Sequence, residues 1–269
     1  MISKKIFLEE GNENVYLEAY IADKLTGLTR DAMLIIPGGA YEGVCAEREG
    51  EPVAMAFMPY GYNTFVLHYS VKSNSDRIFP SQLIEASMAV KHIKDHAEEY
   101  GINPDRVFAC GFSAGGHLCG CLGTMWNMDE IYKAADMPFG YNKPAGIMLV
   151  YPVIKAEYHL DSFKFLLGDE NPSEALLEKC NVANYVDENS VPAFIVHTSN
   201  DQAVDVRNSL VLADAYRKAG KLFEMHIYPD GPHGVALGNK ITRCNNEKWE
   251  NKSIAQWVRM AAEWAEQIR

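Results

Sequence analysis

The chain has 269 residues, of which 48% are hydrophobic and 23% are charged. These fractions are typical of a globular protein and exclude a disordered or fibrous chain, and the length suits one large α/β domain or two small ones. Thirty-six acidic residues against 25 basic residues give a formal net charge of −11, which argues against nucleic acid or an anionic membrane surface as a partner. A homo-oligomer is compatible with this composition.

The N-terminus and the cysteines bear on the compartment in which the protein works. The opening residues, MISKKIFLEEGNEN, contain neither the apolar core nor the small-residue cleavage site of a signal peptide. No apolar run is long enough for a membrane span, and the six cysteines do not form paired metal-binding motifs. We therefore expect a cytoplasmic protein with reduced thiols and without a bound metal.

Predicted strands alternate with predicted helices along the chain. An antiparallel pair is expected at residues 6–8 and 15–21, with a turn at 11–12. Continuous apolar runs predict buried strands at 33–36, 64–69, 107–110, 145–151, 193–198 and 223–228. Helices are expected at 51–58, from 80 to about 100, after Ser113, at 205–220 and at 252–268. This order predicts an α/β fold with a mostly parallel sheet and helices on both of its faces.

The domain organisation is expected to be simple. No change of composition and no flexible linker divides the sequence, so residues 1–269 are predicted to form a single domain. Segments 126–143 and 154–189 are the least regular parts of the chain. Because long irregular segments of a compact domain often form lids or binding loops, we expect a lid or a substrate-binding insertion at these two segments.

A serine motif, GFSAG at residues 111–115, follows the predicted strand at 107–110 and precedes a helix. In this order of elements the serine lies on a sharp turn that exposes its hydroxyl group. The following helix directs its amide groups and its positive dipole end to the place where an oxyanion would form. The short pattern occurs by chance in about one in ten chains of this length. Its flanking elements therefore carry the prediction that Ser113 is a nucleophile.

A catalytic serine needs a base, and the histidines of the sequence compete for that role. Those at positions 68, 92, 96 and 226 lie within predicted helices or strands. His117 follows Ser113 by four residues and lies along the same helix instead of over the turn. His233 lies in the polar loop PDGPHG directly after the last predicted strand. That position fits a triad whose chain order is serine, acid, histidine, so His233 is the predicted base.

Two aspartates are candidates for the acid that orients the base. Asp201 lies three residues past the predicted strand at 193–198, where a carboxylate can reach a histidine on the next loop. Asp205 lies at the predicted start of the following helix, where a carboxylate caps free backbone amides. We prefer Asp201 and keep Asp205 as the second candidate.

The oxyanion of an acyl-transfer reaction needs backbone amide donors. Ala114, directly after the predicted nucleophile, supplies one of them. The sequence Gly38-Gly39-Ala40 follows the predicted strand at 33–36 and is suited to supply another, because glycine allows the backbone to turn its amides inward. Which amide of this loop points inward is left open.

The chain resembles the α/β-hydrolase fold, and within it the acetyl esterase/lipase group, which is related to bacterial carbohydrate acetyl esterases and feruloyl-esterase-like proteins. The resemblance extends from about residue 33 to 264 and is carried by PGGAYEGVCAEREGEPVA, GYNTFVLHYSV, INPDRVFACGFSAGGHL, SFKFLLGDENPSEALLEKC, VPAFIVHTSNDQAV and HIYPDGPHGV. It implies Ser113 as nucleophile, Asp201 as acid and His233 as base. It also implies an oxyanion hole formed by amides near Gly39, Ala40 and Ala114.

The sequence departs from the family pattern at two places. Related esterases often have His-Gly-Gly-Gly where this chain has Pro37-Gly38-Gly39-Ala40. Many relatives have Val-Pro after the acid, where this chain has Val204-Asp205. Neither departure removes a predicted catalytic group.

These residues predict a serine hydrolase without a cofactor that cleaves small acyl esters, in particular acetyl groups on a sugar or another alcohol. Gly38, Tyr41, Trp126 and Tyr158 are candidate substrate-binding residues. An amidase or peptidase of the prolyl-oligopeptidase type is a lower-ranked alternative, because no propeller domain is evident. A third alternative is a hydrolase fold that binds a ligand without catalysis.

Overall fold

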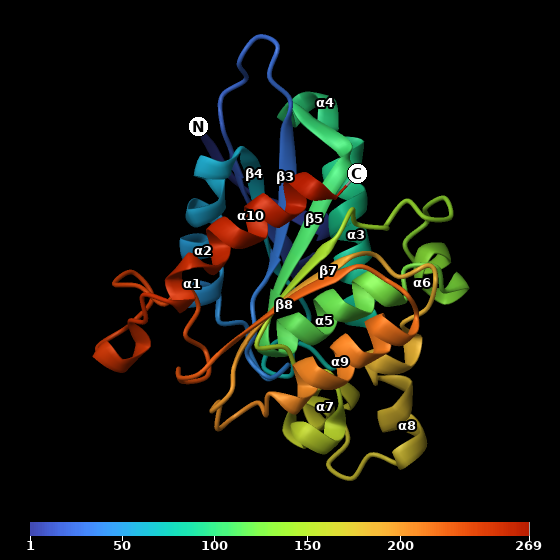
Figure 1. Ribbon diagram of the computed structural model, residues 1–269. Coiled ribbons are helices and arrows are strands. Elements are labelled where there is room, and N and C mark those ends of the chain that lie inside the picture. Colours follow the sequence, from blue (N-terminus) through green and yellow to red (C-terminus); the bar gives the residue numbers. More distant parts are fainter. Residues whose placement is uncertain (269) are drawn as a thin grey trace.

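A computed structural model of the protein describes residues 1–268 (Figure 1). Its strands form one sheet in the order β1-β2-β4-β3-β5-β6-β7-β8. Strand β2 pairs antiparallel with β1 and β4, and the remaining neighbours pair in parallel. The strands are β1 (Ile2–Glu9), β2 (Asn12–Ile21), β3 (Arg30–Ile36), β4 (Tyr62–His68), β5 (Ile102–Phe112), β6 (Ile147–Val150), β7 (Ala193–Thr198) and β8 (Phe223–Tyr228).

The central strands are apolar because both faces of the sheet are covered. Every residue of β6 and β7 is buried, which explains the continuous apolar runs in their sequences. Strand β1 lies at one edge of the sheet and alternates between exposed and half-buried residues. The sequence therefore indicates the position of a strand in the sheet as well as its existence.

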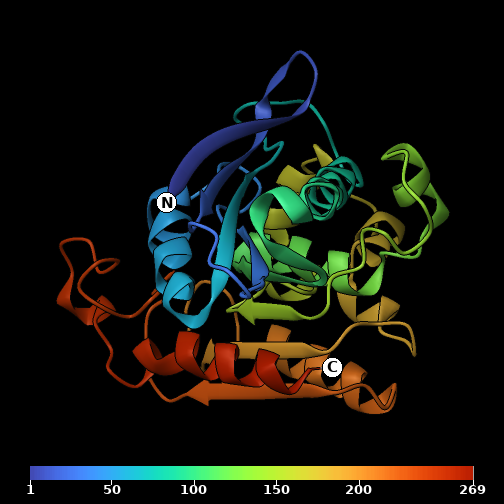
Figure 2. The ribbon, with the colours of Figure 1, turned by 90° about the horizontal axis from the view of Figure 1, so that it is seen from above.

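Helices cover both faces of the sheet (Figures 1 and 2). Helices α2 (Glu51–Phe57) and α10 (Trp257–Gln267) pack on one face, where the Trp257 ring contacts the rings of Phe57 and Phe112. Helices α3 (Ser81–Asp95), α5 (Ser113–Thr124) and α9 (Arg207–Lys218) pack on the other face. Within residues 1–268, no helix combines the length and apolar character that crossing a membrane requires.

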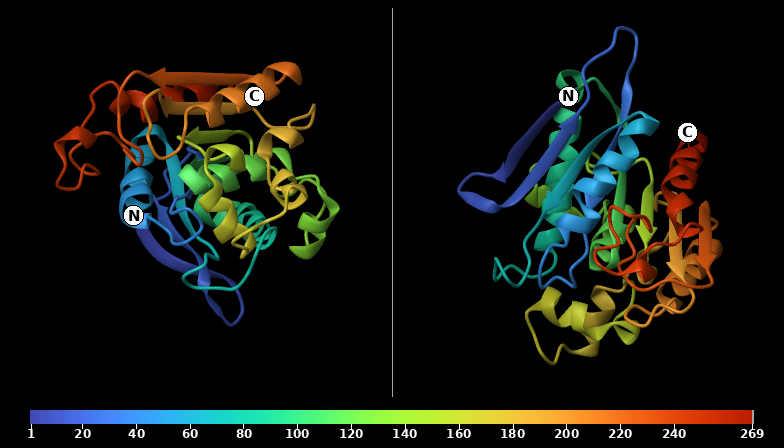
Figure 3. Two further views of the ribbon diagram at one scale, coloured as in Figure 1. Left: turned by 90° about the horizontal axis from the view of Figure 1, so that it is seen from below. Right: turned by 90° about the vertical axis from the view of Figure 1, so that its left-hand side faces the viewer.

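Shorter helices occupy the connections between these elements. They are α1 (Ala46–Glu49), α4 (Ala97–Tyr100), α6 (Asp129–Ala134), α7 (Leu160–Leu167) and α8 (Glu174–Lys179), with 3-10 turns at Met58–Tyr60, Ala156–Tyr158, Val182–Tyr185, Glu247–Trp249 and Ile254–Gln256. Figure 3 shows α7 and α8 together at one end of the molecule, beyond the strands. The segment that contains them begins beside the serine turn, because the Val153 amide donates to the Ser113 carbonyl at 3.0 Å.

Three predicted helices differ from the structure at their ends. The helix expected from 80 to about 100 is divided into α3 and α4 at His96, whose side-chain Nδ1 hydrogen-bonds to the His92 carbonyl that also accepts the His96 amide. Helix α9 begins at Arg207 instead of 205, because the Asp205 carboxylate accepts the Arg207 amide. The last helix begins at Trp257 instead of 252, after a 3-10 turn.

Candidate active site

Ser113 lies at the sharp turn between β5 and α5, as the motif predicts. Its φ angle is +51°, a left-handed conformation that costs energy for a residue with a side chain. Close packing of the backbone leaves little room for another arrangement, because a Cβ atom at Gly115 would collide with the carbonyl oxygens of Ile36 and Pro37. The packing of α5 against the end of β3 therefore holds Ser113 in its strained conformation.

His233 lies in the loop after β8 and bridges the serine to an aspartate. Its Nε2 is 2.9 Å from Ser113 Oγ, and its Nδ1 is 2.7 Å from Asp201 Oδ2. A carboxylate only accepts hydrogen bonds, so Nδ1 carries the proton and donates it to Asp201. The Nε2 lone pair then accepts the hydrogen bond of the Ser113 hydroxyl. We refer to these three residues as the Ser–His–Asp array.

Asp201 is held in place from several sides. Its side chain is inaccessible to solvent, and Oδ1 accepts the amides of Ala203 and Val204 at 2.9 and 3.0 Å. Nε2 of His197 hydrogen-bonds to the Val204 carbonyl at 2.9 Å and lies 3.5 Å from Oδ2. Burial acts to raise the pKa of Asp201, but the nearby His197 side chain and the hydrogen bond and charge of His233 outweigh it and lower that pKa far below the ordinary value. Asp201 is therefore ionised across the physiological range.

The second candidate for the acid has a different role. Asp205 accepts the backbone amide of Arg207 at 2.8 Å and forms an ion pair with its guanidinium at 2.8 Å. It thus caps the start of α9, and His233 Nδ1 binds Asp201 instead.

The loop after β3 contains three consecutive residues with positive φ: Gly39, Ala40 and Tyr41. The Gly38 amide donates to the Glu49 carboxylate at 2.8 Å, so it is not free to bind an oxyanion. Within residues 1–268, the amides of Gly39 and Ala40 have no hydrogen-bond partner. Ala114 lies in the first turn of α5, where amides have no acceptor within the helix. The amides that the resemblance implied are thus without a partner, the Gly38 amide is bound, and the oxyanion hole itself stays a prediction.

Two of the aromatic residues predicted to line the pocket lie elsewhere. Tyr41 is 2% exposed and packs in the core, with its hydroxyl 2.7 Å from His117 Nδ1. Trp126 follows the far end of α5 and donates Nε1 to the Asn189 carbonyl. The 12 residues of α5 separate it from Ser113 by about 18 Å, at 1.5 Å per residue. Burial of Tyr41 and the distance of Trp126 from Ser113 argue against contact of either side chain with a substrate, and the two assignments stay predictions.

The fourth candidate, Tyr158, is half-buried, with the Arg207 guanidinium over its ring at 4.7 Å. Its contact with a substrate stays a prediction.

Three polar residues near the array were not singled out from the sequence. His197 is the next-to-last residue of β7, and its place directly before the Asp201 loop is a signal for it. His159 lies close enough for His233 to affect it: burial, and then the charge of His233, lower the pKa of His159. The third is Glu49, which accepts the Gly38 amide. Nothing in the local sequence of Glu49 distinguishes it from a surface glutamate.

His117, four residues after Ser113, is a buried structural residue. Its Nε2 lies 2.7 Å from the Cys180 carbonyl, and its Nδ1 accepts the Tyr41 hydroxyl. Burial lowers the pKa of His117 to about 4, although the hydrogen bond to Cys180 opposes this change. The side chain is therefore neutral at physiological pH and inaccessible to a substrate.

This burial predicts an acid-dependent loss of stability. In the unfolded chain His117 has a pKa near 6.5, so between about pH 6.5 and 4 only the unfolded chain binds its proton. The free energy of unfolding is complete above this window and falls by about 3 kcal/mol from this group as the pH drops through it. His117→Gln keeps an amide donor for Cys180 and cannot bind the proton. Urea unfolding of both proteins across the window should give a shallower pH dependence for the variant, and equal slopes would contradict the assignment.

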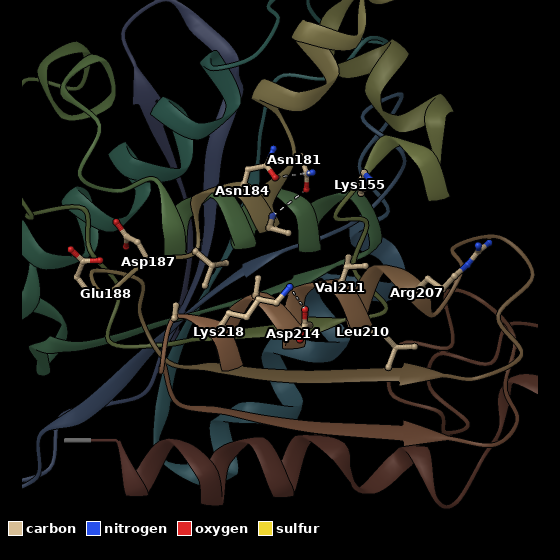
Figure 4. A pocket seen from close by; sticks show the side chains of 14 residues that line it. Lys155, Asn181, Asn184, Asp187, Glu188, Arg207, Leu210, Val211, Asp214 and Lys218 are labelled. Atoms are coloured by element: carbon tan, nitrogen blue, oxygen red, sulfur yellow. Dashed lines mark hydrogen bonds and ion pairs between the residues drawn. The ribbon is translucent and has the colours of Figure 1, made fainter.

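A groove of about 790 Å³ lies between α9 and residues 181–188 (Figure 4). Two cationic side chains of its lining already have partners: Lys218 pairs with Asp214 at 2.6 Å, and Arg207 pairs with Asp205 at 2.8 Å. No residue of the Ser–His–Asp array lines this groove. It is therefore separate from the site described above.

Within residues 1–268, no cluster of three or more histidine, cysteine, aspartate or glutamate side chains is arranged to hold a metal ion.

A serine turn, a histidine loop and an aspartate loop at the carboxyl ends of parallel strands define the α/β-hydrolase fold. The acetyl ester-xyloside bifunctional hydrolase from Caldicellulosiruptor lactoaceticus has the same fold, with a TM-score of 0.84 and 32% sequence identity over 98% of this chain and 96% of that one. The model of the BD-FAE family matches residues 17–216. The chain belongs to this family.

Curated relatives are similar over most of this chain. Endo-1,4-beta-xylanase B of Butyrivibrio fibrisolvens is 37% identical over 215 residues, which are 78% of this chain and 33% of that protein. The acetylxylan esterase of Xylanibacter ruminicola is 30% identical over 217 residues, which are 77% of this chain and 41% of that protein. The chain thus spans less than half the length of each of these two relatives.

Proposed function

We propose that the protein hydrolyses small acyl esters, with acetyl esters of sugars as the substrate class, through an acyl-enzyme on Ser113. The observation that carries this proposal is the continuous hydrogen-bonded path from Ser113 Oγ through His233 to the buried Asp201 carboxylate. A neutral histidine that accepts the serine proton and is oriented by a carboxylate is the arrangement that nucleophilic catalysis requires.

The reaction follows from the protonation states of the array. His233 Nε2 takes the hydroxyl proton as Ser113 Oγ attacks the ester carbonyl carbon. The carbonyl oxygen becomes an oxyanion, which accepts hydrogen bonds from the free amides of the 39–40 loop and Ala114. His233 then transfers its proton to the leaving alcohol as the ester C–O bond breaks. Water, deprotonated by His233, releases the acid by the same route.

The alcohol leaves beside His233, because Nε2 donates the proton to it. A groove of about 490 Å³ is lined by Gly231 and Pro232, the two residues that precede His233 in the chain, together with Trp249 and several polar and charged side chains. Polar groups beside one aromatic ring suit a sugar, which presents both hydroxyl groups and apolar ring faces. The names of the relatives from Xylanibacter and Caldicellulosiruptor support an acetylated sugar as the substrate.

A panel of substrates tests this proposal. We expect acetate release from acetylated xylo-oligosaccharides and a kcat/KM for p-nitrophenyl esters that falls as the acyl chain lengthens from acetyl to octanoyl. Aminoacyl p-nitroanilides serve as the comparison, since the same array on a peptidase would cleave them. Faster cleavage of the anilides than of every ester would favour the peptidase alternative. Tight ligand binding without turnover of any substrate would favour a binding protein.

The groove lined by Gly231, Pro232 and Trp249 makes a specific prediction for Trp249. This ring is half-buried and held by the Arg48 guanidinium at 4.2 Å from its centroid. We expect Trp249→Ala to raise KM for acetylated xylo-oligosaccharides about five- to tenfold, the effect of losing about 1 kcal/mol of ring contact. The kcat/KM for p-nitrophenyl acetate should change less than about twofold, since this ester has no sugar. Phe139→Ala, which removes a 65% exposed ring from the 126–143 segment, is the matched control. Equal effects on both substrates would contradict the assignment of the groove.

A further inference from the structure

Glu49, the last residue of α1, is a buried carboxylate behind the serine turn. It is 2% exposed, and both of its oxygens accept short hydrogen bonds. Oε2 accepts the Gly38 amide at 2.8 Å, and Oε1 accepts the Tyr151 hydroxyl at 2.8 Å. Within residues 1–268, no lysine or arginine forms an ion pair with it. A buried carboxylate without a cationic partner is costly unless hydrogen bonds satisfy it.

The first of these bonds fixes the loop that carries the free amides. Gly38 immediately precedes Gly39 and Ala40, and its Cα lies so close to the nucleophile that an added Cβ would be 2.9 Å from the Ser113 Cβ and 2.9 Å from Glu49 Oε2. Because the Gly38 amide is bound to Glu49, the two following amides have a fixed starting direction. The positive φ angles of Gly39 and Ala40 then turn these amides away from the loop's own carbonyl groups.

The second bond extends to the histidine loop. The Tyr151 hydroxyl donates to Glu49 and accepts the Ala236 amide at 2.9 Å. Its ring packs edge-on against the His233 ring, with centroids 4.9 Å apart. Burial raises the pKa of Tyr151 far above its ordinary value, so the hydroxyl keeps its proton and remains a donor. Glu49 therefore connects the oxyanion loop with the loop that holds the base.

The charge of Glu49 also acts on His233. Burial raises the pKa of Glu49 above its ordinary value, and the hydrogen bonds from Gly38 and Tyr151 and the charges of His233 and Arg48 offset only part of this rise. The interaction is mutual, so a carboxylate at this position favours the positively charged histidine that forms when Ser113 gives up its proton. Asp201 acts on the same ring through Nδ1, and Glu49 acts through the Tyr151 side.

On this geometry, we propose that Glu49 is a positioning residue for the esterase reaction: a second buried carboxylate that aligns the Gly39 and Ala40 amides and supports the His233 imidazolium. This inference rests on the proposed function of the Ser–His–Asp array. Glu49 touches neither the substrate nor the reacting atoms and acts through Gly38 and Tyr151. Its effect is therefore largest in the transition state, where the oxyanion and the imidazolium exist together.

The test replaces Glu49 by glutamine, which has the same shape but no charge and accepts through only one end. Replacing a residue that holds a functional group in place through hydrogen bonds typically costs about 10- to 100-fold in activity. We expect Glu49→Gln to lower kcat for p-nitrophenyl acetate by about 10- to 100-fold with KM within about twofold. Tyr151→Phe keeps the buried ring and removes the connecting hydroxyl, so it should lower kcat by about tenfold. In the double variant, kcat should fall by less than the product of the two single fold-losses, because both substitutions break the same connection between Glu49 and Tyr151.

Glu85 provides a matched control. It is 1% exposed and accepts hydrogen bonds from the backbone amide and the hydroxyl of Ser70. Unlike Glu49, it also forms an ion pair with Arg77 at 3.1 Å, and it has no contact with the oxyanion loop. Glu85→Gln should lower the melting temperature without changing kcat per folded molecule. A Glu49→Gln variant that behaves like Glu85→Gln would overturn the positioning role. If Glu49→Gln does not fold, an unchanged kcat in Tyr151→Phe overturns it. Full activity in Ser113→Ala would instead overturn the proposed function itself.

Discussion

Replacing Ser113 by alanine should lower kcat/KM for p-nitrophenyl acetate by about 10⁴-fold or more, the loss that removal of a catalytic nucleophile typically causes. His233 then has no hydroxyl to deprotonate, and the free amides retain only their contribution to binding and to direct attack by water. The substitution removes one oxygen from a buried turn, so thermal unfolding should change little. Ser199→Ala, which alters a hydroxyl on the loop after β7 that bonds to the Pro229 carbonyl, is the matched control and should remain active.

An active Ser113→Ala variant would exclude the acyl-enzyme mechanism. The variant must be purified carefully, because a trace of contaminating wild-type enzyme hydrolyses the ester at a rate as large as the residual rate expected of the variant. Titration with a phosphonate separates the two cases, since contaminating wild type reacts in a small stoichiometric burst. A steady rate without a burst would belong to the variant itself.

Replacing Asp201 by asparagine should lower kcat by about 10⁴-fold, as expected when a triad histidine loses its carboxylate. The amides of Ala203 and Val204 bind Oδ1, so an asparagine places its oxygen there and directs its NH₂ group at His233. His233 Nδ1 must then accept instead of donate, which moves the imidazole proton to Nε2. In that tautomer Nε2 cannot take the proton of Ser113.

Asp205→Asn is the matched control for this prediction. It removes a charge four residues away at the start of α9, where the partner is Arg207. Because Asp205 has no contact with His233, kcat should stay within about threefold of the wild type, and the cost should appear as a small loss of stability from the weakened cap. Loss of activity in Asp205→Asn with an active Asp201→Asn would reverse the assignment of the acid.

The sequence predicts the sheet of this molecule well because its central strands are buried on both faces. Continuous apolar runs mark β3, β4, β6 and β7, and polar loops follow the strands that carry Ser113, Asp201 and His233. Parallel strands bring their carboxyl ends to one edge of the sheet, so the order of these residues along the chain suffices to predict that they meet. Their separation in the sequence of up to 120 residues does not obscure this signal.

Side-chain direction could not be predicted in the same way. Tyr41 belongs to the oxyanion loop in sequence, but its positive φ angle and its bond to His117 place its ring in the core. Trp126 is close to Ser113 in sequence and separated from it by the length of α5. Glu49 has no distinguishing signal, since its role depends on Tyr151, which is 102 residues away. Such contacts depend on the packing of separate loops, which local periodicity does not encode.

The identity of the nucleophile is the central claim, and peptide mapping after reaction with a fluorophosphonate tests it most directly. The serine reactive toward this reagent must have a neutral histidine beside it and amide donors for the developing negative charge, and the geometry assigns both to Ser113. We predict a single covalent adduct, on the peptide that contains residues 106–118, at a rate that falls sharply in Asp201→Asn. Absence of an adduct under conditions in which the enzyme hydrolyses esters, or an adduct on a different residue, would contradict this account.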